Sequence, residues 1–179
     1  MLIALVAIVA LGLAAVAAQA AKVTGGTSSI TASKAAAKVL ADNHITVKAL
    51  KPATSSGATF TFPIARGRIN VKNLRGTVYH RGGISLSNGR HTVVVRRPVV
   101  VSTKKGAWIV AGARVPGKCK ARKHHKVRCW VLHRFHKVRI LRLTGAKVSG
   151  SSATATAKIT PATAQIVNAL AGKKVVKAG

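Results

Sequence analysis

Acidic side chains are almost missing from this sequence, which has no Glu and a single Asp, Asp42, against 31 Lys and Arg. The shortage excludes a pair of carboxylates sharing general acid and base chemistry, and a magnesium or calcium site built from Asp and Glu. A Ser-His-Asp triad would have to use Asp42. Aromatic residues are also few, at 3%, with one Tyr. We predict from these absences that the protein is not an enzyme.

Positive charge and apolar side chains dominate instead. The formal net charge is +30 over 179 residues, and 48% of the residues are hydrophobic. A chain of this length suits one domain and is long enough to bury a core. A charge of this size favours association with anionic partners, although it does not specify which ones.

The first 18 residues contain no charged side chain and lead into the small-residue pattern Ala18-Gln19-Ala20. Such a run is typical of a secretory signal peptide. An uncleaved membrane anchor is the alternative, because the run is just long enough to span a bilayer. We predict a leader or anchor at 1–20, a single domain at 21–179, and an extracytoplasmic location, secreted or at the cell surface. No Lys or Arg precedes the run, so the positive-inside rule alone would keep the domain in the cytoplasm.

The two cysteines, Cys119 and Cys129, fit an exported protein. In an oxidising compartment a pair at this spacing is best explained by a disulfide that closes a hairpin. Closing so short a loop would contribute roughly 2–3 kcal/mol in the chain-entropy model. The alternative is a metal site, which would need two more ligands from nearby histidines. The candidates are His124, His125, His133 and His136.

Local patterns predict a mainly β fold with two short helices. A helix is expected over 33–42 after the N-cap Ser33, and another after Thr160, beginning with Pro161 and ending at Gly172. From residue 57 strands recur every 8–12 residues, Asn88-Gly89 indicates a hairpin, and Gly67 is expected to separate two strands. Pro98 favours an edge or bulged position. The fold class is therefore β-rich α+β: an antiparallel, two-sheet, sandwich-like domain with an insertion around 117–137.

The strand block 57–101 resembles the HtaA domain of secreted and cell-surface actinobacterial proteins. The shared features are Phe60-x-Phe62-Pro63-Ile64, the stretch from Leu74 to Gly83 that contains Gly-Thr-Val and a double Gly, and a Pro-x-Val strand at Pro98. The resemblance extends over about 30–179. It implies a β-rich exported binding domain, and haem as a candidate ligand. Family members bind the iron through a tyrosine near the N-terminal end of the domain, helped by a histidine near the glycine turn, whereas this chain has no tyrosine before Tyr79.

Tyr79 and His80 are the residues nearest that turn, and they are candidate haem or metal ligands together with the four histidines of 124–136. Neighbouring strand residues point to opposite faces, so at most one of the two side chains faces a given pocket. The other interpretation is one buried and one solvated strand residue.

Residues 117–142 contain ten Lys or Arg with Trp130 and Phe135 among them. Basic side chains with interleaved aromatics suit phosphate contact and base stacking, and they suit acidic envelope polymers or anionic lipid equally well. A solvated basic insertion is the alternative interpretation. The expected polyanion contacts are Lys118, Lys120, Arg122, Lys123, Lys126, Arg128, Arg134 and Lys137.

Two functions therefore remain open at the level of sequence. One is an exported, non-enzymatic HtaA-like binding domain with a haem-related ligand. The other is a cationic protein that binds an acidic envelope polymer, anionic lipid or nucleic acid.

Overall fold

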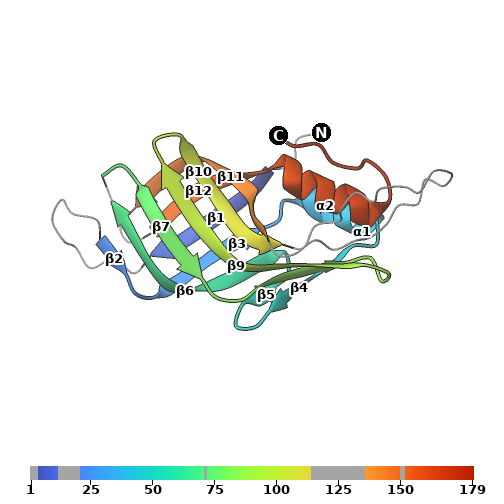
Figure 1. Cartoon of the computed structure of the whole chain (residues 1–179), viewed down its shortest axis with the longest axis horizontal. Helices are drawn as coiled ribbons and strands as arrows, with labels where there is room; N and C mark the ends of the chain where they lie inside the picture. Colours follow the sequence, from blue (N-terminus) through green and yellow to red (C-terminus); the bar gives the residue numbers. More distant parts are fainter. Residues whose placement is uncertain (1–3, 12–20, 71, 114–135, 150–151) are drawn as a thin grey trace.

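A computed structural model describes residues 4–11, 21–70, 72–113, 136–149 and 152–179 (Figure 1). The described elements are β1 (Ala4–Leu11), β2 (Ala21–Val23), β3 (Gly26–Thr31), α1 (Lys34–Asp42), β4 (Thr46–Leu50), β5 (Thr54–Ser56), β6 (Thr59–Asn70), β7 (Arg75–His80), β8 (Gly83–Ser87), β9 (Thr92–Thr103), β10 (Gly106–Ala113), β11 (His136–Ser149), β12 (Ser152–Ile159) and α2 (Pro161–Ala171). The prediction of a β-rich fold with two short helices is confirmed.

The described strands form one antiparallel, 12-stranded sheet that curls on itself. Neighbours run in the order β10, β11, β12, β1, β3, β6, β7 and β9, and β9 pairs back with β10, so these strands close a ring. Strands β8 and β4 continue from β9 outside the ring. The predicted division into two packed sheets is not confirmed, because the ring brings inward-facing side chains together without a second sheet.

Strand β1 closes the ring between β12 and β3. It pairs from Ala4 opposite Lys158 to Ala10 opposite Ser152, and on its other edge from Val6 opposite Thr31. These residues belong to the predicted leader. A chain cut after residue 20 would lack β1, so leader removal and this closed ring exclude each other in one molecule. Cleavage itself stays a prediction.

Each helix follows a strand that borders β1, α1 after β3 and α2 after β12. The Ser33 hydroxyl accepts a hydrogen bond from the Ala36 amide at 3.2 Å and thereby caps α1. Thr160 caps α2 in the same way, and α2 ends at Gly172, whose φ of 69° is left-handed. The helices predicted over 33–42 and from Pro161 to Gly172 are therefore confirmed. Both lie at one end of the curled sheet (Figure 1).

Gly67 does not separate two strands as expected, because β6 runs through it to Asn70. A Cβ atom on Gly67 would lie 2.9 Å from the backbone oxygen of Thr77 on β7. The glycine therefore allows two strands to approach closely, which the sequence alone does not distinguish from a turn.

Pro98 sits in a strand with partners on both edges, so the predicted edge position is wrong and the predicted bulge is right. On one edge β9 pairs with β8 up to Arg96 and with β7 from Val99 onward. On the other edge the register against β10 shifts between Val110 and Gly112. Pro98 has no N–H group and falls where β9 changes partner, so no ladder hydrogen bond is lost.

Two clusters of buried side chains fill the inside of the ring. The larger one contains side chains from each of the strands β8 to β12 and from α2, and it includes Val93, Ile109 and Leu170. The smaller one, toward β2, consists of Val23, Ile64, Ile69 and Val78. The inner face of the ring is therefore mainly apolar, with Ser28 and His80 as buried polar side chains.

Candidate functional site

His80 is buried inside the ring, with 5% of its surface exposed. Its Nδ1 lies 3.0 Å from the carbonyl oxygen of Pro98, and its Nε2 lies 2.7 Å from the hydroxyl of Ser28. A carbonyl only accepts, so Nδ1 carries the proton and donates it, and Nε2 accepts from Ser28. Burial lowers the pKa of His80, and its hydrogen bond to Pro98 acts in the opposite direction. The imidazole is therefore neutral at pH 7, with both nitrogens engaged.

Tyr79 lies on the opposite face of β7, on the outside of the ring. It is 41% exposed, and the guanidinium carbon of Arg66 lies 5.1 Å from the centre of its ring. The structure thus separates Tyr79 from His80, as strand geometry requires. The pair does not form one ligand set, and a metal or haem iron at His80 would have to displace Ser28 or Pro98.

The remaining predicted site residues belong to the basic segment, most of which lies outside the described residues. Those outside are Lys118, Cys119, Lys120, Arg122, Lys123, His124, His125, Lys126, Arg128, Cys129, His133 and Arg134. His136 is the first residue of β11, opposite Ala113, and Lys137 follows it, exposed, opposite Gly112. In the ranges that the structure describes, no three His, Cys, Asp or Glu side chains gather in a way that could hold a metal ion.

A second cationic surface runs across the outside of the ring from β6 to β11. Sequence reasoning counted its Arg139 and Arg142 in the basic segment 117–142, but it missed Arg66, Arg68 and the surface that the four form together. We call it the arginine-flanked strip. Its residues form two rows of cross-strand neighbours, Arg66, Tyr79, Val99, Val110 and Arg139 in one, and Arg68, Thr77, Val101, Trp108 and Arg142 in the other. The four arginines are exposed, and the side chains between them are half-buried except for exposed Tyr79.

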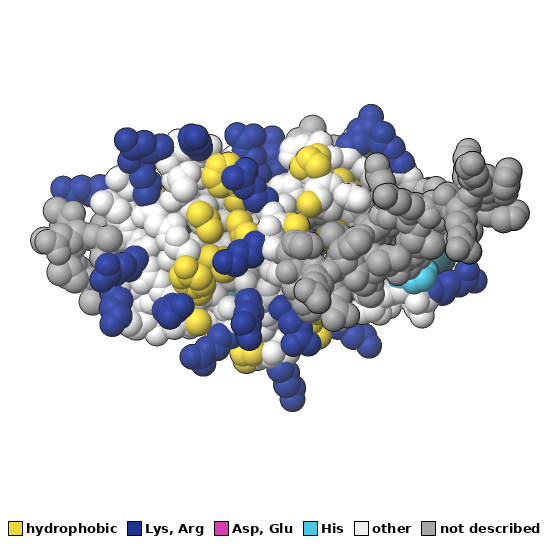
Figure 2. Space-filling view, viewed as in Figure 1, with side chains coloured by type: hydrophobic (Ala, Val, Ile, Leu, Met, Phe, Trp, Pro, Cys, Tyr) yellow, Lys and Arg dark blue, Asp and Glu magenta, His cyan; other side chains and the backbone are white. Residues whose placement is uncertain are grey.

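Cation–aromatic contacts lie at both borders of this strip. Arg139 stacks over Trp108 at 4.4 Å, as Arg66 does over Tyr79 at 5.1 Å. Figure 2 shows hydrophobic side chains over β7, β9 and β10 among Lys and Arg, with no acidic side chain on this face. Asp42, the single acidic side chain of the sequence, is on α1, where its carboxylate pairs with Lys38 at 3.1 Å. No carboxylate side chain therefore neutralises the strip.

Half of the strip could have been predicted from the sequence. Arg66 and Arg68 are two residues apart in a strand, so they point to the same face. Arg139 and Arg142 are three apart, a spacing that in a regular strand would put them on opposite faces. A register shift between Ile109 and Val110 of β10 resolves this, since it sets Val110 opposite Arg139 and Ile109 opposite Leu141. The extra residue on β11 turns both arginines outward.

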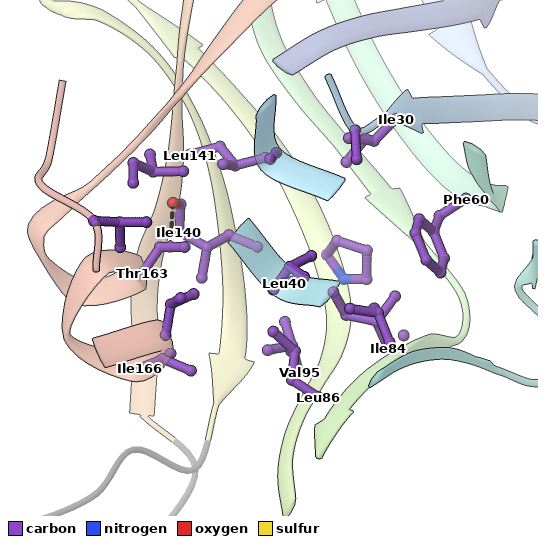
Figure 3. Close-up of a pocket in the computed structure, with 18 of the residues that line it drawn as sticks. Ile30, Leu40, Phe60, Ile84, Leu86, Val95, Ile140, Leu141, Thr163 and Ile166 are labelled. Carbon is purple, nitrogen blue, oxygen red and sulfur yellow. Dashed lines mark hydrogen bonds between the residues drawn. The ribbon is translucent and has the colours of Figure 1, made fainter. Parts of the chain in front are cut away.

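The inner face and the two helices line a cavity of about 170 Å³ that is partly open to the surface (Figure 3). Strands supply Ile30, Phe60, Ile84 and Ile140, and helices supply Leu40 and Ile166, among other apolar residues. Among the described residues that line it, Thr163 is the one with a polar side-chain atom, and its hydroxyl donates a hydrogen bond to the backbone carbonyl of Ile140. Pro98, which accepts from His80, also lines the cavity.

None of the helices that the structure describes is both long enough and apolar enough to cross a membrane. Comparisons of the chain with family models, with curated proteins and with solved structures found no match. The resemblance to the HtaA domain therefore stays a prediction, and the two surfaces of the ring are the features that bear on function.

Proposed function

We propose that this protein is a non-enzymatic, extracytoplasmic binding domain that associates with polyanions through its outer surface. The observation that supports this most strongly is the arginine-flanked strip, in which four exposed arginines surround aromatic and valine side chains. Phosphate or carboxylate groups of a polymer would bind the arginines, and the apolar centre would contact its sugars or bases. An acidic envelope polymer and a nucleic acid both have this chemistry.

The width of the strip suits a polymer better than a small anion. Arg66 and Arg139 lie on strands four positions apart in the sheet order, which corresponds to about 19 Å at the usual strand spacing. A chain lying across the strands would meet a cation at each border. The interaction would be electrostatic in origin, so its affinity should fall steeply with salt.

Salt-dependent binding of a fluorescent single-stranded oligonucleotide and of polyphosphate, with neutral dextran as competitor, tests this proposal. In the test variant Arg66, Arg68, Arg139 and Arg142 are replaced by Gln. The matched control replaces the exposed residues Lys34, Lys48, Lys173 and Lys174 by Gln, which removes the same charge away from the strip. Because the test variant lacks four phosphate-binding cations, its slope of log affinity against log salt should flatten by about 3.

A third variant, in which Lys118, Lys120, Arg122, Lys123, Lys126 and Arg128 become Ser, examines the predicted basic segment separately. If this variant loses the salt slope and the strip variant keeps it, the contact surface is the basic segment and the strip is not the site. If the lysine control loses as much as the strip variant, binding follows net charge alone. Competition by dextran would contradict an electrostatic mechanism.

The haem-related role implied by the resemblance remains the second hypothesis. Both ring nitrogens of His80 are hydrogen-bonded, which argues against His80 as an available iron ligand.

A further inference from the structure

The cavity between the sheet and the two helices offers almost nothing for water to bind. Its described lining is apolar except for Thr163, whose hydroxyl already donates to Ile140. Among the described side chains, no buried nitrogen or oxygen lacks a hydrogen-bond partner. A water molecule needs two to four polar partners to stay in a protein interior, so this cavity favours an apolar occupant.

The cavity is also large for a protein interior. Its volume of about 170 Å³ is comparable to the roughly 150 Å³ of an engineered apolar cavity that stays dry and takes up benzene. Native interiors contain few voids larger than a water molecule, because an empty space forfeits the contacts of its lining. A filled cavity would recover those contacts.

Of the two helices that line this cavity, α1 is the less deeply buried. Its only buried residue is Ala36, and its larger apolar residues Val39 and Leu40 are half-buried although they line the cavity. In α2, by contrast, Ile166 and Leu170 are both 2% exposed. A ligand would therefore reach the cavity more readily by displacing α1 than by displacing α2.

We propose that this cavity binds the hydrocarbon chain of a fatty acid or a similar single-chain anionic amphiphile. The apolar lining selects the chain, and the net charge of +30 favours an anionic headgroup left at the surface. This site is separate from the arginine-flanked strip, because the cavity lies on the inner face of the sheet and the strip lies on its outer face. Its existence does not depend on polyanion binding.

Isothermal titration calorimetry of the full chain with decanoate tests the proposal, with 1-decanol as uncharged analogue and acetate as short-chain anion. Ala36→Leu and, independently, Ala32→Leu add bulk at two lining positions. Ala37→Leu adds the same bulk at an exposed position on α1 and serves as the control. Each variant is first checked by circular dichroism and thermal unfolding.

Decanoate and decanol are expected to bind with one-to-one stoichiometry, and acetate is not. Each lining variant that folds should lower the affinity for both ligands about tenfold or more, since the added carbons occupy the space of the hydrocarbon chain. The control variant Ala37→Leu should leave the affinity unchanged. Binding of decanoate without decanol, or at the same strength as acetate, would show surface attraction only and overturn the proposal. So would equal affinities in the lining variants and in the control.

Discussion

The inner and outer faces of the ring are built from the same strands but present opposite chemistry. On β10, Ile109 faces inward and is 3% exposed, whereas its neighbour Val110 faces outward beside Arg139. Among the described residues, the core clusters of the inner face contain no charged side chain, and the outer face concentrates the cations. Two-residue alternation therefore separates the two surfaces, so each can be altered without the other.

Burying a charge on the inner face is expected to have the largest effect. Ile109→Asp would place an unpaired carboxylate in the core, and we expect a loss of roughly 3–5 kcal/mol, enough to unfold a marginal domain. Val110→Asp, one residue away, should change stability by less than about 0.5 kcal/mol because its carboxylate reaches solvent and Arg139. Urea denaturation of both variants measures the difference. Similar losses in the two would mean that the faces are not distinct.

A smaller effect is expected at His80, a buried polar group of the inner face. Its folded-state pKa is lowered by burial, so the unfolded chain binds a proton more readily. The stability contributed by neutral His80 is therefore complete above the unfolded pKa of about 6.5 and declines as the pH falls below it toward the folded pKa. We expect thermal stability to fall between pH 7.5 and pH 5.

The variant His80→Gln should remove most of this pH dependence. It should also cost about 1–3 kcal/mol at pH 7.5 if Ser28 or Pro98 loses its partner. His44→Asn is the control, since His44 is exposed and has a positive φ of 52° that Asn tolerates. A pH dependence that persists in His80→Gln and disappears in His44→Asn would contradict the assignment.

The smallest effect is expected on the outer face. Arg139→Gln removes the guanidinium from the ring of Trp108 and should cost about 0.5–1 kcal/mol. The quenching of Trp fluorescence by acrylamide, a neutral quencher, should increase, because the covered ring face becomes accessible. Lys137→Gln, also exposed on β11, removes an equal charge and should leave both quantities unchanged. A larger loss in the lysine variant would show that charge, rather than stacking, is responsible.

Local sequence patterns were enough to predict the two helices and the hairpin between β8 and β9. The residues that begin and end the helices contact only neighbours a few positions away in the chain, so their roles are set before any distant contact forms. These residues are Ser33, Thr160, Pro161 and Gly172. The Asn88-Gly89 turn is of the same kind. The cavity was not predictable, because its lining comes from strands and helices far apart in the chain.

The bulge in β11 shows most clearly what depends on tertiary pairing. Ile140 and Leu141 are consecutive, yet both line the cavity, while Arg139 and Arg142 on either side face outward. Two-residue alternation alone would have put one of the two apolar residues outside. The register shift against β10 permits this arrangement, and it exists only once β11 and β10 have paired.

Composition and neighbouring residues are sufficient to establish the shortage of carboxylates, the large positive charge, the β-rich fold class and the helix boundaries, because none of these needs a distant partner. Two other features arise only when the chain has folded: residues 4–11 pair between β12 and β3 and so complete the ring, and His80 is buried against Ser28 and Pro98. These features depend on partners between 18 and more than 100 residues away, and no local pattern specifies which distant strand edge will be met.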